Sequence, residues 1–311
     1  MYFIFKMFYF ILFYLFSLSS LFGFDYESSP ANDAPRLNHA LTLAKQGDIM
    51  NQLNLGRMYL YGEGVEKNNS QALYWLSRAG RQGDSRAQYM VGQMYLEGIG
   101  VGANKYEAIK WFRLSAKKGN VEAQYLIALA YASGRFGLIV DYEESLKWHE
   151  MAAKGGNLHS QYLLGLSYLN GEFITANKKK AFKWMKKSAN QNNAKAQYEL
   201  ASMYKDGIGV SQNYPKALSW YEKARDNGYA FAASSMAYIY LDGEGVNVNR
   251  VKSFSNYLIY KKLRLNQPLK DFEIESDRII RSLFDSYKKT LSQQEINKAQ
   301  ARANQFINGI E

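Results

Sequence analysis

The feature that most constrains this chain is a set of residue columns that recur about every 36 residues. One column contains only tyrosines, at Tyr59, Tyr95, Tyr131, Tyr168, Tyr204 and Tyr240. A glycine follows three residues later in every case. All five tryptophans of the chain occupy a further column, at Trp75, Trp111, Trp148, Trp184 and Trp220. Self-similarity at a fixed period of this length indicates an array of stacked supersecondary units.

Each unit contains two helical patterns joined by a glycine-marked turn. In the second unit the first pattern places Ala87, Val91 and Tyr95 on one face, and the second pattern does the same with Ala108 and Phe112. Small residues recur where two helices must approach closely, at Gly56, Gly92, Ala128, Gly165, Ala201 and Ala237. The spacing therefore predicts packed helix pairs.

The turns between the two helices carry the sequences GEGV and GIGV in four of the units. Paired glycines supply the positive φ values that end a helix and reverse the chain. Phe136 and Phe173 replace the second glycine in the third and fourth units. We therefore expect irregular turns in those two units.

The repeated pattern Ala-Gln-x-x-Leu-Gly-x-x-Tyr-x-x-Gly-x-Gly-Val, followed by Ala-x-x-Trp, resembles that of Sel1-like repeats, which are relatives of the tetratricopeptide repeat (TPR). The resemblance extends from Gly47 to about Leu263 and includes six copies. It implies an all-α fold, a right-handed α/α solenoid of six helix-turn-helix repeats. It also implies a protein that binds other proteins, with the first helices lining a concave face.

The units expected from this register are residues 47–82, 83–118, 119–155, 156–191, 192–227 and 228–263. Residues 37–46 resemble a lone second helix, and residues 264–311 depart from the pattern, as capping elements at the ends of a stacked array do. In the C-terminal part, an acidic stretch with Asp271, Glu273 and Glu275 suggests a loop. The sequence SQQE from Ser292 to Glu295 predicts a capping box that opens the last helix.

Residues 1–24 combine one positive charge, at Lys6, with a continuous apolar run from Met7 to Phe16 and small residues after it. This pattern is typical of a signal peptide, with residues 25–36 as a linker. An uncleaved anchor is the competing interpretation, because an apolar stretch of about 18 residues is long enough to span a membrane. The chain is expected to be periplasmic or secreted if cleaved, and tethered to the inner membrane if not.

The composition limits the kinds of catalytic and metal-binding site that the chain can form. The chain has 311 residues, a net charge of +11 and no cysteine. The absence of Cys excludes disulfides, thiol catalysis and zinc-thiolate sites. The three histidines, His39, His149 and His159, show no metal-ligand spacing. No Ser-His-Asp signature or phosphate-binding loop is present. We therefore predict no catalytic residues, no metal site and no cofactor.

On the first helices, residues that turn away from the packing face are candidates for partner contact, and the resemblance places them on the concave face. One column holds four successive tyrosines, Tyr89, Tyr125, Tyr162 and Tyr198. Such a ladder suits recognition of a peptide, because tyrosine offers contact area at small entropy cost. The adjacent column varies in chemistry, as a specificity-setting surface would, and includes Arg57, Gln93 and Tyr238. Tyrosines are equally suited to packing between adjacent first helices, so the sequence leaves both roles open.

A second candidate surface is basic. The stretch KKKAFKWMKK brings together Lys178, Lys179, Lys180, Lys183, Lys186 and Lys187. On the convex side of a solenoid these lysines are suited to anionic lipid headgroups or acidic envelope polymers. A solvated helix face is the alternative interpretation. Nucleic acid is disfavoured by the export signal and by the lack of base-stacking aromatics on this face.

The sequence thus predicts an exported, monomeric, non-catalytic scaffold or adaptor that binds a protein or peptide on its concave surface. An immunity or inhibitor protein that neutralises a secreted toxin enzyme is one alternative. Penicillin binding has been associated with a cysteine-rich exported subgroup of the family, so a β-lactam-binding or β-lactam-hydrolysing protein is a further alternative. The absence of cysteine from this chain argues against it.

Overall fold

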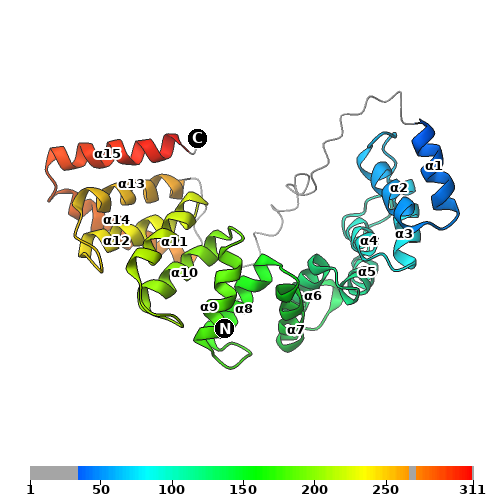
Figure 1. Cartoon of the computed structure of the whole chain (residues 1–311), viewed down its shortest axis with the longest axis horizontal. Helices are drawn as coiled ribbons and strands as arrows, with labels where there is room; N and C mark the ends of the chain where they lie inside the picture. Colours follow the sequence, from blue (N-terminus) through cyan, green and yellow to red (C-terminus); the bar gives the residue numbers. More distant parts are fainter. Residues whose placement is uncertain (1–33, 266–270, 310–311) are drawn as a thin grey trace.

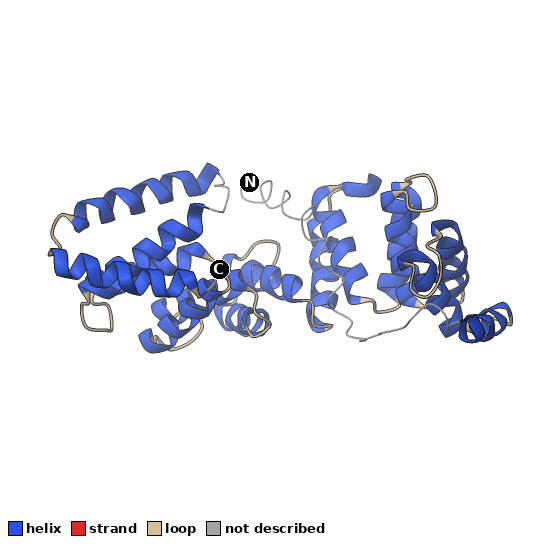
Figure 2. Ribbon diagram, turned by 90° about the horizontal axis from the view of Figure 1, so that it is seen from above, coloured by secondary structure: helices blue, strands red, loops and turns tan. Residues whose placement is uncertain are grey.

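The structure is a computed structural model that describes residues 34–265 and 271–309. Within these residues the chain forms fifteen α-helices, one short 3₁₀ helix and no strand. The helices follow an arch, with α1 at one end and α13, α14 and α15 at the other (Figure 1). Figure 2 shows the same row of helices from above. The predicted all-α solenoid is confirmed.

The helices alternate in six pairs. The first helices are α2 (Ile49–Tyr61), α4 (Ser85–Glu97), α6 (Val121–Ser133), α8 (Leu158–Asn170), α10 (Ala194–Asp206) and α12 (Ala230–Asp242). The second helices are α3 (Asn69–Arg81), α5 (Lys105–Lys117), α7 (Tyr142–Lys154), α9 (Lys178–Ala189), α11 (Tyr214–Asp226) and α13 (Arg250–Leu265). The ends are covered by α1 (Ala34–Lys45), α14 (Asp271–Lys288) and α15 (Gln293–Asn308). Near the middle of the arch, α6 lies on its inner side and α7 on its outer side (Figure 1).

Close approach of paired helices explains the small residues. A Cβ atom at Gly92 would lie 2.7 Å from Phe112 Cδ1, and one at Gly165 would lie 3.1 Å from Met185 Cε. The missing side chain therefore makes room for the large core residue of the partner helix. The small residues behave as the sequence pattern predicts.

Asparagine and aspartate begin nearly every helix of the array. The side-chain oxygen of Asp84 accepts hydrogen bonds from the N–H groups of Arg86 and Ala87, and equivalent caps open the other first helices from α2 to α10. The second helices have caps of the same kind, such as Asn177. Each cap satisfies backbone donors and contributes about 1 kcal/mol. The first helix α12 is the exception, because Tyr229 occupies its N-cap position without a side-chain hydrogen bond.

In the first five units a buried glutamine joins the unit to the helix before it, whereas the sixth unit has Ala233 at this position. The amide nitrogens of Gln52, Gln88, Gln124, Gln161 and Gln197 donate to carbonyl oxygens at the end of the preceding helix, at 2.8 to 3.1 Å. The amide oxygen of Gln161 also accepts from Gln191 Nε2 at 2.8 Å. These glutamines satisfy helix-end carbonyls that would otherwise be left without a partner inside the protein.

The turns that lack the second glycine differ from each other. In the third unit the 3₁₀ helix η5 (Arg135–Gly137) interrupts the turn, as predicted. In the fourth unit the prediction of an irregular turn is wrong, because this turn contains no 3₁₀ helix and follows the same course as the turn of the first unit. Phe173 takes the left-handed conformation of Gly64, with a φ of 58° against 69°. A left-handed residue with a side chain costs about 1–2 kcal/mol. The Phe173 ring stacks on Tyr142, with centroids 4.4 Å apart, and this contact offsets part of the cost.

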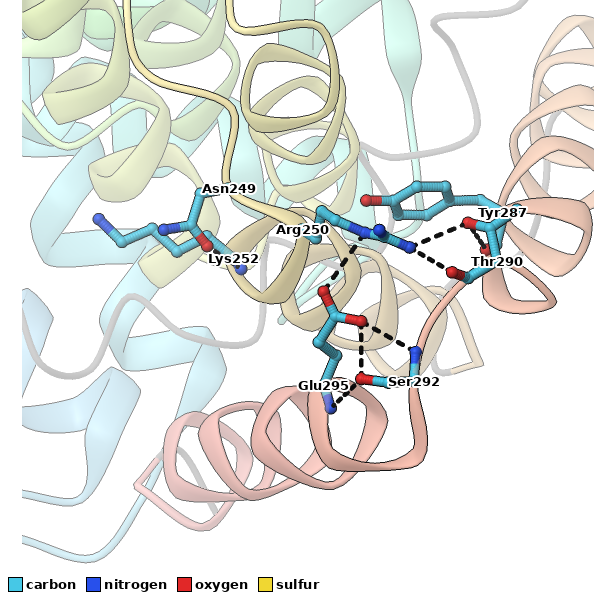
Figure 3. A network of polar contacts seen from close by, with 7 residues as sticks. All are labelled: Asn249, Arg250, Lys252, Tyr287, Thr290, Ser292 and Glu295. Atoms are coloured by element: carbon cyan, nitrogen blue, oxygen red, sulfur yellow. Dashed lines mark hydrogen bonds and ion pairs between the residues drawn. The ribbon is translucent and has the colours of Figure 1, made fainter.

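The C-terminal helices close the array through one polar network (Figure 3). Arg250 of α13 donates to the Thr290 carbonyl oxygen, and its Nε lies 3.3 Å from Glu295 Oε1. Glu295 and Ser292 form the predicted capping box of α15. The predicted acidic loop is wrong, because α14 begins at Asp271 and includes Glu273 and Glu275. Acidic residues favour a helix N-terminus, so they fit the start of α14 equally well.

The prediction that residues 1–24 form a signal peptide or anchor concerns residues outside the described ranges, as does the linker prediction for residues 25–33. The last three residues of the predicted linker belong to α1 instead, because this helix begins at Ala34. Across residues 34–265 and 271–309, none of the helices has the length and apolar character needed to cross a bilayer.

Candidate functional site

The four predicted ladder tyrosines occupy equivalent positions on α4, α6, α8 and α10, and all four are half-buried. Burial raises the pKa of each phenol, to about 12 for Tyr125, so the hydroxyls stay protonated. Each tyrosine therefore presents a partly accessible ring with a neutral hydroxyl. This combination allows apolar contact and hydrogen bonding to one partner.

The tyrosine rings also pack within and between units. The Tyr125 ring stacks on His159 of the next unit, at 5.5 Å and 23°. The Tyr198 ring lies 5.0 Å from Tyr229 of the next unit. The Tyr89 ring lies 5.7 Å from Phe112 of its own unit. The packing role left open by the sequence is therefore present, and it restrains the rings of Tyr89, Tyr125 and Tyr198.

The neighbouring column is less uniform. Arg57 and Gln93 are half-buried, and Gln93 Nε2 donates to the Tyr89 hydroxyl at 3.2 Å. Tyr238 is also half-buried, and its ring meets Phe284 of α14 edge-on at 5.5 Å. Helix α14 thus covers part of the column at the C-terminal end of the array, which the repeat pattern does not reveal.

A polar group replaces apolar core at the junction of the third and fourth units. His149 is buried where the neighbouring units have Phe112 and Met185, and its Nδ1 lies 3.0 Å from Ser160 Oγ. Burial lowers the pKa of His149 to about 4, so the ring is neutral at pH 7. Ser160 has no exposed surface. The pair is therefore closed to substrates and serves packing.

The six predicted lysines of the basic surface lie at the start of α9 and along it, and all are exposed. Lys180 and Lys187 place their ammonium groups over the rings of Tyr168 and Trp184, at 5.1 and 4.5 Å. Among the residues that the structure describes, none of the six forms an ion pair with a carboxylate. Units four to six carry 15 Lys and Arg against 7 Asp and Glu, whereas units one to three carry 13 against 11. The positive charge is therefore concentrated in the C-terminal half of the array.

Two shallow hollows lie away from the tyrosines. One of about 260 Å³ is lined by Asn192, Gln197 and Trp220, and one of about 560 Å³ lies along α14 beside Ile279 and Leu283. Across the described ranges, no three His, Cys, Asp or Glu side chains come together in an arrangement able to hold a metal ion. The tyrosine face is an extended surface, which suits a macromolecular partner better than a small molecule.

Sequence reasoning missed two features of this surface. Glu199 follows Tyr198 on α10 and is half-buried, and Tyr229 stands at the start of α12 against the Tyr198 ring. A column comparison could have found both. Glu199 is the one charged residue among Asn54, Met90, Leu126, Leu163, Glu199 and Ser235, and Tyr229 replaces the Asp or Asn of the other units.

The model of the Sel1 repeat family matches the chain at residues 52–84, 85–120, 121–157, 158–193, 194–229 and 230–258. These matches together cover well over half of the chain. No curated protein matches the chain.

Solved structures of other Sel1-like repeat proteins also resemble this chain. A protective antigen present in uropathogenic Escherichia coli strains, which displays an SLR fold, is 26% identical with a TM-score of 0.65 over 89% of this chain. The match covers 57% of that protein, so this chain spans just over half of its length. A Sel1 repeat protein from Oxalobacter formigenes is 28% identical with a TM-score of 0.57, over 73% of this chain and 98% of that chain.

An immunity protein from Pseudomonas aeruginosa is 19% identical with a TM-score of 0.37, over 76% of this chain and 85% of that chain. A likeness of that degree carries no functional argument.

Proposed function

Because the chain belongs to the Sel1 repeat family, we propose that it is an exported binding protein without catalytic activity that holds a protein or peptide partner against the concave face of its first helices. Sel1 repeats generally build a non-catalytic fold that mediates protein binding. The observation that carries the proposal is the ladder of half-buried tyrosines on four successive first helices. No single pocket defines the site, so the partner spans several units.

Rigidity supports this mode of binding. The ring contacts of Tyr125 and Tyr198 with the next unit fix the side chains before a partner arrives. The caps and the buried glutamines fix the spacing of the helices that carry them. Preorganisation lowers the ordering cost of binding on the protein side. A partner with matching spacing therefore gains affinity from contacts that the free protein has already arranged.

Export is part of the proposal and is supported by the charge and apolar run of residues 1–24. In the periplasm or beyond, the partner is an envelope or secreted protein. An immunity role, with a toxin enzyme as partner, is the alternative that identification of the partner would distinguish.

The test is affinity capture with the full-length chain in mild detergent, followed by identification of the captured protein and measurement of its Kd. The double variant Tyr125→Ala with Tyr162→Ala is expected to weaken binding by about 2 kcal/mol or more, which is about 30-fold in Kd. The matched control is Lys183→Ala with Lys186→Ala on α9, which should leave Kd unchanged. Circular dichroism checks the fold, and Tyr125→Phe with Tyr162→Phe retains the packing while removing the hydroxyls. Wild-type affinity in both tyrosine variants would refute the proposal.

The exposed lysines of α9 support a second proposal, that this helix contacts an anionic surface such as a phosphatidylglycerol bilayer. Each lysine near such a surface contributes about 1 kcal/mol. Lys183→Glu with Lys186→Glu should therefore reduce cosedimentation with phosphatidylglycerol vesicles by at least tenfold. Lys147→Glu with Lys154→Glu makes the same charge change on α7, where both lysines are already ion-paired, and serves as control. An equal reduction in both variants would point to net charge rather than to α9.

A further inference from the structure

A carboxylate without a partner lies on the tyrosine face. Glu199 of α10 is half-buried, and no hydrogen bond or ion pair reaches its carboxylate from the residues that the structure describes. Burial raises the pKa of this group, because water is removed and no positive charge replaces it. Partial burial removes some of the water that would solvate this charge, which disfavours the ionised acid in the folded protein. A ligand that brings a positive charge would remove that cost.

Three tyrosines share this part of the face with the carboxylate. Tyr198 precedes Glu199 on α10, and the Tyr229 ring lies against the Tyr198 ring. The repeat gives Glu199 the same relation to Tyr162 that Ser235 has to Tyr198, whose hydroxyl Ser235 contacts. The charge of Glu199 also raises the pKa of all three phenols. The Tyr198 and Tyr229 rings are 5.0 Å apart at 56°, and Ser235 Oγ donates to the Tyr198 hydroxyl at 3.5 Å. The two rings are therefore inclined to each other on the face that carries the acid. Aromatic faces attract cations, and the attraction grows when water is excluded.

Tyr229 belongs to this cluster and occupies the N-cap position of α12, which therefore lacks a side-chain cap. The other five first helices begin with an Asp or Asn that caps the backbone, whereas α12 begins with Tyr229 and has no side-chain cap. The missing cap costs about 1 kcal/mol. Positions that break a local rule of stability are expected at functional sites. This observation is independent of the charge on Glu199.

The chain already binds one guanidinium in this way nearby. Arg264 lies over the Phe231 ring at 5.2 Å and within 3.9 Å of Glu273. Phe231 is itself next to Tyr229, with ring centroids 6.1 Å apart. The neighbouring cation of α10, Lys195, lies one turn before Glu199, and its charge acts on His159 of the preceding unit. Burial is the only cause that acts on the pKa of Glu199, so neither of these cations neutralises the acid.

We propose that Glu199, Tyr162, Tyr198 and Tyr229 form a subsite that receives an arginine side chain of the bound partner. The proposal rests on the proposed function, because it names one contact on the same concave face. A guanidinium fits better than an ammonium, since its plane stacks on aromatic rings while its edge donates two hydrogen bonds to a carboxylate. The subsite gives the tyrosine ladder a fixed point at its C-terminal end.

The probe is N-acetyl-arginine N-methylamide, titrated into the full-length chain and followed by NMR of ring-labelled tyrosines. The citrulline analogue has the same shape without the charge and should bind at least tenfold more weakly. Glu199→Gln should weaken arginine binding at least fivefold, whereas Glu97→Gln, which changes an exposed acid at the end of α4, should not. Equal binding of the two probes, no binding of arginine to the wild type, or no effect of Glu199→Gln would overturn the subsite.

Tyr229→Asn separates binding from folding. Asparagine restores the cap that α12 lacks, so the variant should stay folded while its arginine binding falls several-fold. Retained wild-type binding in this variant would also contradict the subsite. Partner capture distinguishes the two proposals. Loss of the partner in the Tyr125 and Tyr162 variant but full retention in Glu199→Gln would preserve the concave face and reject the subsite. Partner capture that neither variant weakens, with arginine binding by the wild type intact, would reject the proposed function alone.

Discussion

Lys118→Gln is expected to stabilise the protein, because it supplies a hydrogen bond that one unit lacks. The amide oxygen of Gln88 is buried without a partner inside the described protein. In the first unit the equivalent oxygen, on Gln52, accepts from Gln82 Nε2 at 2.7 Å. Lys118 follows Gln88 by the same thirty residues that separate Gln82 from Gln52. Lys118 holds the sequence position of that donor, but its side chain makes no hydrogen bond to Gln88.

The backbone is already suited to the change. Lys118 has φ −84° and ψ 6°, against −81° and −1° for Gln82. A glutamine side chain at position 118 would therefore extend from the backbone in the same direction as that of Gln82. A typical hydrogen bond contributes about 0.5–1.5 kcal/mol net, and an unsatisfied buried acceptor costs about 1–3 kcal/mol. Lys118 is exposed and forms no ion pair among the described residues. The expected gain is therefore about 1 kcal/mol.

Urea unfolding of the two proteins, followed by tryptophan fluorescence and circular dichroism, measures this difference as a shift in midpoint at constant slope. Lys118→Met is the control, since it removes the charge without adding a donor. The reverse change, Gln82→Lys in the first unit, should destabilise by a similar amount. If Lys118→Gln is no more stable than Lys118→Met, the shared amide bond contributes nothing and the reasoning about the glutamines is wrong.

Two further predictions concern backbone strain and pH. Gly209→Ala should destabilise the protein by about 3 kcal/mol or more, because its Cβ would collide with the Lys178 carbonyl oxygen. Gly119→Ala has open space around its Cβ and should cost only about 1 kcal/mol, for the positive φ of this position. Urea unfolding of the two variants compares these free energies. The pKa of His149 is about 4 in the folded state and about 6.5 in the unfolded state, so only the unfolded state takes up this proton between these pH values. The free energy of unfolding should therefore fall as pH drops through this window, by about 1.4 kcal/mol per pH unit. His149→Met with Ser160→Ala should flatten this slope in unfolding measured from pH 7 to 4.

Much of the fold could be predicted because the period fixes it. A column of glycines such as Gly92 and Gly165 and a column of large residues such as Phe112 can coexist at 36-residue spacing only if helices pack in register. The start of α14 could not be predicted in the same way, because it lies beyond the last repeat and its acidic residues suit either a loop or a helix N-terminus.

The site was accessible only in part. The tyrosine ladder is visible as a column, but whether Tyr125 packs or binds depends on His159, a residue of the next unit that the sequence does not place. The glutamine beside each tyrosine is equally regular, yet its role requires knowing that a helix-end carbonyl lies 3.1 Å away, as it does for Gln161. Periodicity indicates that a position is used in the same way in every unit. It does not identify the atom or residue that the side chain contacts.

The residues that break a column are more informative about function than those that keep it. A residue repeated in all six units has a role that is common to all units, and the role common to all units is to stack on their neighbours. Phe173 and His149 break their columns, and each finds a compensating contact inside the protein, with Tyr142 and Ser160. Glu199 and Tyr229 also break theirs, but the acid has no partner in the described residues and the tyrosine leaves a helix uncapped. Tyr229 gains ring contacts with Tyr198 and Phe231, but among the described residues no positive charge pairs with Glu199. That charge is best sought in a ligand, and a cation beside aromatic rings is the group that both residues would favour.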